Sequence, residues 1–350
     1  MCGICGIVNF DGQPVSDNSI SKMMQLIKHR GPNDEGKYVE ENLGMGFVRL
    51  SIIDLSSKGH QPMLDKSGRY SITHNGEVYN YLEIKNTLLK KGYTFKSGTD
   101  TEVILNSYIE WGEDCLHKFN GMWSFVIYDK KEKSLFISRD RFGIKPFYYY
   151  YDKNRFIYSS EIKSIISCFN KKKVQINDQS LYDYLVFNRT DQSDDTFYRN
   201  IKKLQHGHFI TITNNQVQIK KWYNLNKSIS NPFLSKDEYL ETFRSSIKLR
   251  LRSDVPIGLM LSGGIDSSSI ASVLKDEYSH LNTFSAIFPG EKHIDESKYI
   301  YAFKQYFSNM HFITPDAESL FSDLHRFIQL HDEPVFRTGP YIQFKLMELA

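Results

Sequence analysis

The sequence predicts an α/β protein of two domains, with an antiparallel sheet system first and a parallel sheet second. Three observations support this prediction. The length of 350 residues corresponds to about two domains. Short, aromatic-rich strand segments follow one another between residues 122 and 160, which is typical of antiparallel sheets. From residue 254 the pattern becomes apolar strand, glycine-rich turn, helix and strand, which indicates a βαβ unit.

The composition is that of an ordinary globular protein, with 40% hydrophobic and 24% charged residues. The net charge of +3 is small and the basic run Lys171–Lys173 is short, so we expect a solvated face there and no nucleic-acid partner. No stretch approaches the ~18 apolar residues of a membrane span, and no signal peptide is evident. Four cysteines without a disulfide framework favour a reducing compartment. We therefore expect a cytoplasmic protein with no membrane partner.

The first ten residues, MCGICGIVNF, hold Cys2 and Cys5 in a C-x-x-C spacing. A structural zinc site needs four ligands, and no second C-x-x-C or paired histidine motif follows. A redox pair normally begins a helix, whereas GIVNF is strand-like. A third interpretation has better chemistry: removal of Met1 would make Cys2 the N-terminal residue. Its α-amine, with an ordinary pKa of about 8, is then a general base tied to its own thiol.

Two helices of the first half are predicted from apolar spacing. The first covers residues 18–30 and ends at Gly31-Pro32. The second covers residues 97–112, where Asp100, taken alone, is a helix cap. The residues expected to face the core are Ile20, Met23, Met24 and Ile27 in the first helix and Val103, Ile104, Tyr108 and Trp111 in the second.

Two polar features stand in strand-like stretches. Arg49 is alone in the apolar run of residues 45–55, MGFVRLSIIDL, which predicts a strand. It is either an edge-strand residue or a guanidinium fork for a substrate carboxylate. Asn75-Gly76 follows a strand-like segment and, taken alone, predicts a hairpin turn.

The second half changes character after a further strand-like region at 196–226. A polar, proline-containing stretch predicts a linker at 225–235. Ser235–Glu238 then has the form of a capping box, before a helix with Leu240, Phe243, Ile247 and Leu251 on one face. The segments DVPIGLM, LSGGIDSSSIASVLKDEY and NTFSAIF follow as strand, turn with helix, and strand.

The N-terminal segments together resemble the glutaminase domain of the glutamine-hydrolysing asparagine synthetases. The resemblance rests on MCGICGIVNF, HRGPNDEG, RLSIIDL, NGEVYN, SGTDTEVIL, RDRFGIKPFYY and YSSEIKSI, which occur in this order. It implies an N-terminal-nucleophile (Ntn) hydrolase fold, an αββα four-layer sandwich in which two sheets lie between helices. The domain would cover residues 1–224.

The resemblance also implies a catalytic apparatus. Cys2 would attack the side-chain amide of glutamine with its own α-amine as base. Asn75 and the Gly76 N–H would form the oxyanion hole, whose donors each typically contribute ~10²–10³ in rate. Arg30 would bias Cys2 towards the thiolate, and Cys5 would be a small buried residue.

The same resemblance implies how glutamine binds. Arg49 would hold the α-carboxylate of glutamine, and Glu77 and Asp100 would hold its ammonium group. The chemistry of the residues agrees, because a zwitterionic amino acid needs one partner of each sign.

The turn LSGGIDSS, residues 261–268, indicates phosphate binding. Adjacent glycines let backbone N–H groups approach a phosphate, and a helix N-terminus favours an anion. The turn lacks the lysine of a P-loop and does not match the dinucleotide fingerprint. It resembles the loop of the ATP pyrophosphatases, a parallel α/β fold of doubly wound type, which cleave ATP between the α- and β-phosphates. The residues implied to contact ATP are Leu261, Ser262, Gly263, Gly264, Asp266, Ser267, Ser268 and Ile287, with Asp266 holding Mg²⁺.

Together the halves predict a glutamine-hydrolysing carbon–nitrogen ligase. Ammonia from glutamine would pass to a carboxylate activated as an acyl-adenylate, giving an amide, AMP and pyrophosphate. Aspartate is the expected acceptor. The alternatives are another carboxylate, such as a sugar acid or a natural-product intermediate, and a glutaminase-only or regulatory fragment. A homodimer is compatible with the sequence.

One departure from the family pattern stands out. The chain ends at TGPYIQFKLMELA, with Tyr341, Ile342, Leu346 and Leu349 on an apolar face, before the second glycine- and acid-rich loop of the family. We expect residues 236–350 to be an incomplete synthetase domain, either truncated or degenerate. We therefore do not expect the isolated chain to synthesise the amide.

Overall fold

The chain folds as two units, Met1–Pro232 with antiparallel sheets and Phe233–Ala350 with a parallel sheet. The structure is a computed structural model that describes residues 1–170, 174–229, 232–291 and 294–350. The predicted basic run Lys171–Lys173 lies outside the described residues. Residues 230–231 of the predicted linker 225–235 also lie outside the described residues. The first residues of this linker form the short helix α7, Leu225–Ser228.

Two six-stranded antiparallel sheets form the body of the first unit. The first sheet has the order β10-β8-β9-β1-β3-β2, and the second has the order β12-β11-β7-β6-β5-β4. The strands of the first sheet are β1 Gly3–Asn9, β2 Asp34–Glu40, β3 Leu43–Arg49, β8 Tyr148–Tyr151, β9 Arg155–Ser159 and β10 Lys202–Lys203. Those of the second are β4 Met63–Leu64, β5 Tyr70–Val78, β6 Gly121–Asp129, β7 Ser134–Arg139, β11 His208–Thr213 and β12 Gln216–Lys221.

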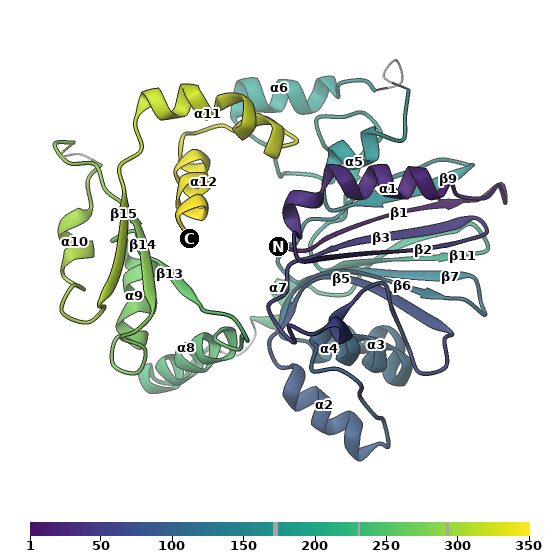
Figure 1. The fold of residues 1–350 in the computed structure, drawn as a ribbon, viewed down its shortest axis with the longest axis horizontal. Helices are drawn as coiled ribbons and strands as arrows, with labels where there is room; N and C mark the ends of the chain where they lie inside the picture. Colours follow the sequence, from purple (N-terminus) through teal and green to yellow (C-terminus); the bar gives the residue numbers. More distant parts are fainter. Residues whose placement is uncertain (171–173, 230–231, 292–293) are drawn as a thin grey trace. The chain divides into compact units, whose positions relative to one another are not determined.

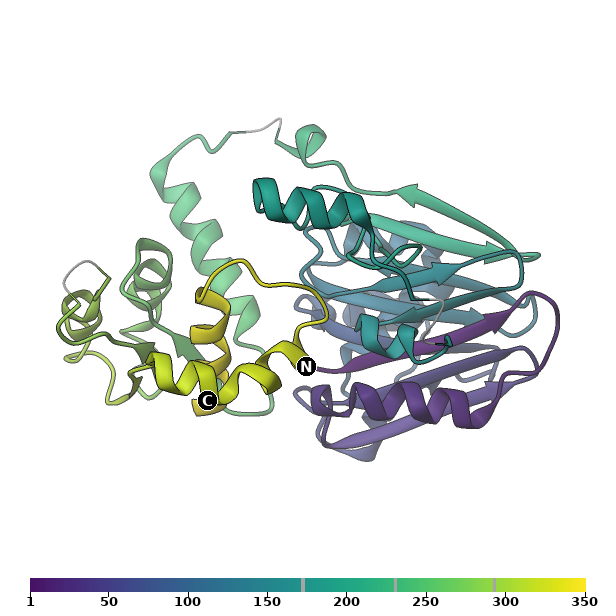
Figure 2. The same ribbon diagram turned by 90° about the horizontal axis from the view of Figure 1, so that it is seen from above.

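Helices cover the outer face of each sheet (Figure 1). Helices α1 and α5 pack on the first sheet, and α1 runs alongside β1 when the unit is seen from above (Figure 2). Helices α2, α3 and α4 pack on the second sheet. The bounds are α1 Asp17–Leu26, α2 Tyr81–Lys90, α3 Asp100–Trp111, α4 Cys115–Lys118, α5 Ile162–Ile166 and α6 Asp178–Phe187. The predicted αββα four-layer arrangement is confirmed.

The layers follow from the two-residue period of the strands. In β1, Ile4 and Val8 point into the core between the sheets, whereas Cys5 and Ile7 point towards α1. Because both faces of this strand are covered, its sequence is apolar almost throughout rather than alternating.

Both predicted helices of the first half are present. Residues 18–30 form α1 and a following 3-10 turn, Lys28–Arg30, and the four predicted core residues of this segment are buried. Residues 97–112 contain α3, in which Val103 and Ile104 are buried while Tyr108 and Trp111 are half-buried against the same core.

Two predictions about local structure are corrected. The strand predicted over 45–55 ends at Arg49, because the guanidinium of Arg49 bonds the carbonyl oxygens of Asp54 and Ser56 and folds the chain back on itself. Asn75-Gly76 does not form a hairpin turn. Both residues lie inside β5, paired with Ser124 and Trp123 of β6, so the tertiary pairing overrides the local turn signal.

The aromatic-rich strands between residues 122 and 160 are antiparallel as predicted, but they belong to different sheets. Strands β6 and β7 pair in the second sheet, and β8 and β9 pair in the first. The loop from Asp140 to Phe147 therefore crosses from one sheet to the other, and this crossing carries it past the start of β1.

The second unit contains a three-stranded parallel sheet of order β13-β14-β15, as the predicted βαβ unit requires. Its strands are β13 Gly258–Met260, β14 Asn282–Ala286 and β15 Asn309–Ile313. Its helices are α8 Lys236–Arg250, α9 Ile265–Leu274, α10 Ser297–Tyr301, α11 Ala317–Leu330 and α12 Gly339–Leu349. No helix among the described residues is long and apolar enough to cross a membrane.

The predicted capping box of α8 is half formed. Ser235 Oγ accepts a hydrogen bond from the Glu238 N–H at 3.1 Å, as expected of the cap. The Glu238 carboxylate, however, accepts from the N–H of Leu234 at 2.7 Å. The reciprocal bond therefore reaches one residue further back than the sequence pattern predicts.

Candidate active site

Cys2 lies immediately before β1, at the head of a strand that is paired on both sides, with β3 and β9. Its Sγ accepts a hydrogen bond from the Leu50 N–H, with sulfur and nitrogen 3.4 Å apart. Burial raises the pKa of the thiol, while the Leu50 N–H and the charge of Lys145 lower it. The strand pairing thus fixes the sulfur, and neighbouring donors favour its anion.

Cys5 is fully buried in the core beneath α1, next to Gly46 of β3 and Met24. Because side chains alternate along a strand, Cys5 and Cys2 point to opposite faces of the first sheet. The C-x-x-C spacing therefore does not bring the sulfurs of Cys2 and Cys5 together. The prediction that Cys5 is a small buried residue is confirmed.

Asn75 and Gly76 face Cys2 from the middle of β5. The Asn75 side chain is 1% exposed, and neither its Oδ1 nor its Nδ2 has a hydrogen-bond partner among the described residues. A buried amide without partners is costly, so its retention points to a function. Gly76 has no room for a side chain, because a Cβ there would lie 2.1 Å from the Met122 carbonyl oxygen.

Arg49 is the last residue of β3 and is almost completely buried. Its Nη1 donates to the Ser56 carbonyl at 2.8 Å, and Nη2 donates to the Asp54 carbonyl. Gly59 makes this position possible, since a Cβ there would lie 1.9 Å from Nη2. The guanidinium is therefore held by neutral carbonyls and keeps its charge available to an anion.

Glu77 and Asp100 supply the negative charge of the site. Burial raises the pKa of Glu77. Burial, with the charge of Glu77, raises the pKa of Asp100 to about 7, although the Val78 N–H donates to its Oδ2 at 2.8 Å. The helix cap expected at Asp100 is instead Thr99, whose Oγ1 accepts from the Glu102 N–H. Asp100 is thereby free to face the site.

These residues meet in one small pocket. All six side chains or backbone positions that the sequence predicts for glutamine hydrolysis line a space of about 50 Å³: Cys2, Arg49, Asn75, Gly76, Glu77 and Asp100. Met1 forms part of the same wall. Segments that are far apart in the sequence are therefore brought together at the ends of neighbouring strands.

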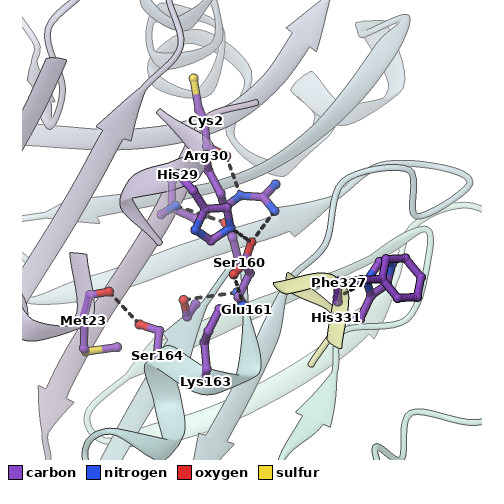
Figure 3. A network of polar contacts seen from close by, with 12 residues as sticks. Cys2, Met23, His29, Arg30, Ser160, Glu161, Lys163, Ser164, Phe327 and His331 are labelled. Atoms are coloured by element: carbon purple, nitrogen blue, oxygen red, sulfur yellow. Dashed lines mark hydrogen bonds and ion pairs between the residues drawn. The ribbon is translucent and has the colours of Figure 1, made fainter. Parts of the chain in front are cut away.

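Arg30 lies behind Cys2 in an ionic network (Figure 3). Its Nε donates to the Cys2 carbonyl oxygen at 3.0 Å, and Nη1 donates to Glu161 at 2.9 Å. His29 and Lys163 also contact the Glu161 carboxylate, at 2.9 and 2.6 Å. Burial opposes ionisation of Glu161, but these partners hold its pKa at about 2. Arg30 is thus positioned to anchor the backbone of Cys2 as well as to place charge near it.

Lys145 is a residue of this site that the sequence reasoning did not assign. Its ammonium lines the same pocket although the residue is only 4% exposed. The signal available in the sequence was a lysine within RDRFGIKPFYY, between apolar residues and directly before a proline. Its burial arises from the crossing of the loop between the two sheets, which the sequence pattern does not reveal.

The glycine-rich loop of the second unit connects β13 to α9. Gly263 has φ +86°, and a Cβ there would lie 2.9 Å from the Glu296 carbonyl oxygen, so glycine is required. The hydroxyls of Ser262 and Ser267 are 3.0 Å apart, and the Gly264 N–H donates to Ser262 Oγ. The loop is therefore held by its own hydroxyls before any ligand binds.

Four of the eight residues predicted for ATP line two different cavities, and Gly263, Gly264, Ser267 and Ile287 line neither. Leu261 and Ser262 line one of about 290 Å³ at the carboxyl ends of β13 and β14, where ligands of parallel sheets bind. Asp266 and Ser268 line a wider cleft of about 930 Å³ between α8 and α9. Ile287 lies beyond the end of β14, where its N–H donates to the Ile313 carbonyl.

Among the described residues, no three His, Cys, Asp or Glu side chains group as a ready-made metal site. This is compatible with Mg²⁺, which is commonly held by one or two carboxylates together with substrate phosphates. Asp266, in the first turn of α9 and open to the cleft, is a carboxylate suited to that arrangement.

Comparison with known proteins assigns both units. Residues 1–223 match the family model of a glutamine amidotransferase domain, and residues 238–350 match that of asparagine synthase. A Methanocaldococcus jannaschii protein, provisionally named glutamine-hydrolysing asparagine synthetase 2, is 39% identical over the whole chain and 72% of its own length. Glutamine-hydrolysing asparagine synthetase 1 of Bacillus subtilis is 36% identical over 85% of the chain.

A Gibberella zeae protein named as an amidase is 32% identical over 80% of the chain. The chain spans 48% of the length of the Bacillus subtilis protein and 43% of the Gibberella zeae protein.

The Glu161 network generates a prediction about stability. Glu161→Gln leaves the partly buried Arg30 and Lys163 without the buried carboxylate that they share, so the free energy of unfolding at about pH 7 should fall by about 3 kcal/mol. The native pKa of about 2 lies below the ordinary value, so this contribution is present above about pH 4.5 and fades as the pH falls through 2. Denaturant unfolding at several pH values measures the difference. The exposed Glu132→Gln should change stability by less than about 0.5 kcal/mol, and a pH-independent Glu161→Gln effect would contradict the assignment.

Proposed function

The chain belongs to the family of glutamine-hydrolysing asparagine synthetases, which are amidotransferase ligases, and on this premise we propose that Cys2 hydrolyses glutamine and that the second unit binds ATP. The observation that carries the proposal is the buried, unpartnered amide of Asn75 in one pocket with Cys2. The rest of the pocket has the charge pattern of a zwitterionic amino acid.

The two ends of the pocket suit the two charges of glutamine. The guanidinium of Arg49 offers a fork for the α-carboxylate. Glu77 and Asp100 offer a negative pair for the ammonium group. Their raised pKa values support this role, because two neighbouring buried carboxylates are relieved when a cation binds between them.

Hydrolysis then proceeds by covalent catalysis. The proton of the Cys2 thiol passes to the α-amine, and sulfur attacks the side-chain carbonyl carbon of glutamine. Asn75 Nδ2 and the Gly76 N–H stabilise the resulting oxyanion. The ammonium of Cys2 returns its proton to the leaving nitrogen, which departs as ammonia and leaves a thioester. Water attacks the thioester to give glutamate and restores the thiol.

This mechanism needs the α-amine of Cys2, and therefore removal of Met1. Cys2 is small, as the residue after a removable methionine usually is, and Met1 lies in the wall of the pocket. Burial and the charges of Arg30 and Lys145 lower the pKa of the Met1 α-amine to about 6, although Cys2 raises it. The same burial and the same two cations would lower the pKa of a Cys2 α-amine, which favours its neutral, proton-accepting form.

ATP would bind along the glycine-rich loop. At Gly264 a Cβ would meet only Ser262 Oγ, at 3.4 Å, so the loop leaves room for a phosphate there, and Asp266 would hold Mg²⁺ against the pyrophosphate. Bound Mg²⁺ would supply charge neutralisation to the leaving pyrophosphate. The contribution of the chain is to hold the loop in place through the Ser262–Ser267 hydroxyl pair.

Aspartate is the acceptor that we propose, because several relatives carry the name asparagine synthetase. A second candidate is another carboxylate, which is favoured by the similarity over both units to a relative named as an amidase. Release of pyrophosphate on addition of single carboxylates, aspartate first, distinguishes the two.

The nucleophile is tested by glutamate release from glutamine. Wild type and Cys5→Ala should both hydrolyse glutamine, whereas Cys2→Ala should lose activity by at least ~10³-fold, because no thiolate remains to attack. Intact mass shows whether Met1 is absent in each protein. Activity that survives Cys2→Ala would exclude the proposed mechanism.

The carboxylate fork is tested by steady-state kinetics. Arg49→Ala should raise KM for glutamine by ~10²-fold or more, well above any fall in kcat, since the fork binds ground and transition states alike. Arg49→Lys keeps the charge but not the bidentate geometry, so its KM should lie between those of wild type and Arg49→Ala. An unchanged KM in Arg49→Ala would remove the proposed role.

The nucleotide site is tested by calorimetric titration with ATP in the presence of Mg²⁺. Asp266→Asn should weaken Mg²⁺-dependent binding by ~10-fold, because a charged metal ligand becomes neutral. Asp276→Asn, which alters a carboxylate of the same cleft at the far end of α9, is the matched control and should bind normally. Equal affinities of wild type and Asp266→Asn would contradict the assignment of Asp266.

A further inference from the structure

Lys145 is a buried cation on which the charge of Glu77 acts without forming an ion pair in the described structure. Among the described residues, the contact recorded for its Nζ is with Met1 Sδ at 2.9 Å, a weak acceptor. It forms no ion pair within 4.0 Å in that part of the chain. An unpaired buried ammonium is costly, so a protein retains one chiefly where the charge itself is used.

The backbone of Lys145 is clamped on both sides. Its N–H donates to Asp140 Oδ2 at 3.0 Å, and its carbonyl accepts from Arg139 Nε at 2.7 Å. Asp140 is fully buried and also accepts from the N–H groups of Trp123, Phe142 and Ile144. The side chains of Arg139 and Asp140 thus hold the backbone of the loop. Such a clamp gives the ammonium a fixed place in the pocket rather than a mobile one.

The loop joins β7 of the second sheet to β8 of the first. Lys145 shares the pocket with Cys2 and Glu77. If Met1 is removed, the thioether contact is lost and the ammonium faces the new N-terminal residue. Its charge then acts on both members of the thiol–amine pair.

We propose that Lys145 is a positioning residue that sets the protonation of Cys2 electrostatically, favouring thiolate over thiol and neutral amine over ammonium. This inference rests on the proposed glutamine hydrolysis at Cys2. A fixed positive charge beside the pair stabilises the anionic sulfur and destabilises a second cation. Lys145 accepts no proton in the reaction; it keeps the α-amine ready to accept one.

Other charged groups also act on the thiol and the amine of Cys2. Those facing Lys145 or Cys2 from neighbouring elements are Glu77 of β5, Arg30 after α1, Asp100 of α3 and Asp140 after β7, and Glu161 after β9 acts on the amine. The charge of Arg30 lowers the pKa of the terminal amine, as that of Lys145 does. Arg30, however, forms an ion pair with Glu161 at 2.9 Å. Lys145 is therefore the cation of this group whose charge is left uncompensated by an ion pair in the described structure.

The test compares Lys145→Met, which removes the charge at similar size, with Lys145→Arg, which keeps it. The primary readout is the rate of iodoacetamide alkylation of Cys2 against pH, followed by intact mass in a Cys168→Ser background. Cys168 is replaced because it is the other cysteine that is not fully buried. This readout reports the thiolate fraction without requiring catalysis.

In Lys145→Met the pH midpoint of alkylation should rise by about one unit, because loss of the positive charge raises the pKa of the thiol and of the amine. The acid limb of kcat/KM for glutamine should move upward by a similar amount, so that kcat/KM on that limb falls ~10-fold. Lys145→Arg should keep the midpoint of wild type. Lys133→Met, at an exposed lysine paired with Glu41, is the matched control and should change neither profile.

Three outcomes separate the two proposals. Identical alkylation midpoints in wild type and Lys145→Met would overturn the role of Lys145, whatever the glutaminase activity. A uniform loss of kcat at every pH without a shifted midpoint would do the same, since it indicates a purely structural role. A shifted midpoint in a protein that hydrolyses no glutamine would support the role of Lys145 and contradict the proposed hydrolysis.

Discussion

The pairing of β1 on both sides is the constraint on which the site depends. A chain terminus ordinarily frays, because nothing holds its backbone. Here β1 lies between β3 and β9, and the Ile4 N–H and carbonyl also bond Ser160, by its Oγ at 3.0 Å and its N–H at 2.9 Å. The backbone directly after Cys2 is therefore held within the sheet. This supports the proposal that a terminal amine and thiol at Cys2 meet the substrate in one geometry.

The same pairing recruits the rest of the pocket. Gly3 of β1 is opposite Val48 of β3, so Arg49 follows directly beside Cys2. The end of β9 supplies Glu161, which holds Arg30 against the Cys2 carbonyl. The second sheet supplies Asn75 from β5. The pocket is thus the place where the ends of strands from both sheets meet.

Charge is distributed unevenly over this small volume. Two carboxylates, Glu77 and Asp100, face one part of it with raised pKa values, while cations surround the sulfur. Arg30 is paired with Glu161, whereas Arg49 donates to backbone carbonyls and Lys145 is buried without an ion pair among the described residues. Under the proposed function this distribution suits a zwitterion and developing negative charge, at a cost in stability that the surrounding layers must offset.

Local sequence determined most of the elements and six of the residues that line the site. The apolar periods of α1 and α3 and the strand–turn–helix at LSGGIDSS appear in the structure as predicted. The family motifs named six positions that line one pocket. Tertiary structure decided what depends on distant partners. Asn75-Gly76 became strand because β6 pairs with it, and Thr99 took the cap that Asp100 was expected to form. Lys145 entered the site because its loop joins two sheets, and burial without a counter-ion is a property of packing that no local pattern contains.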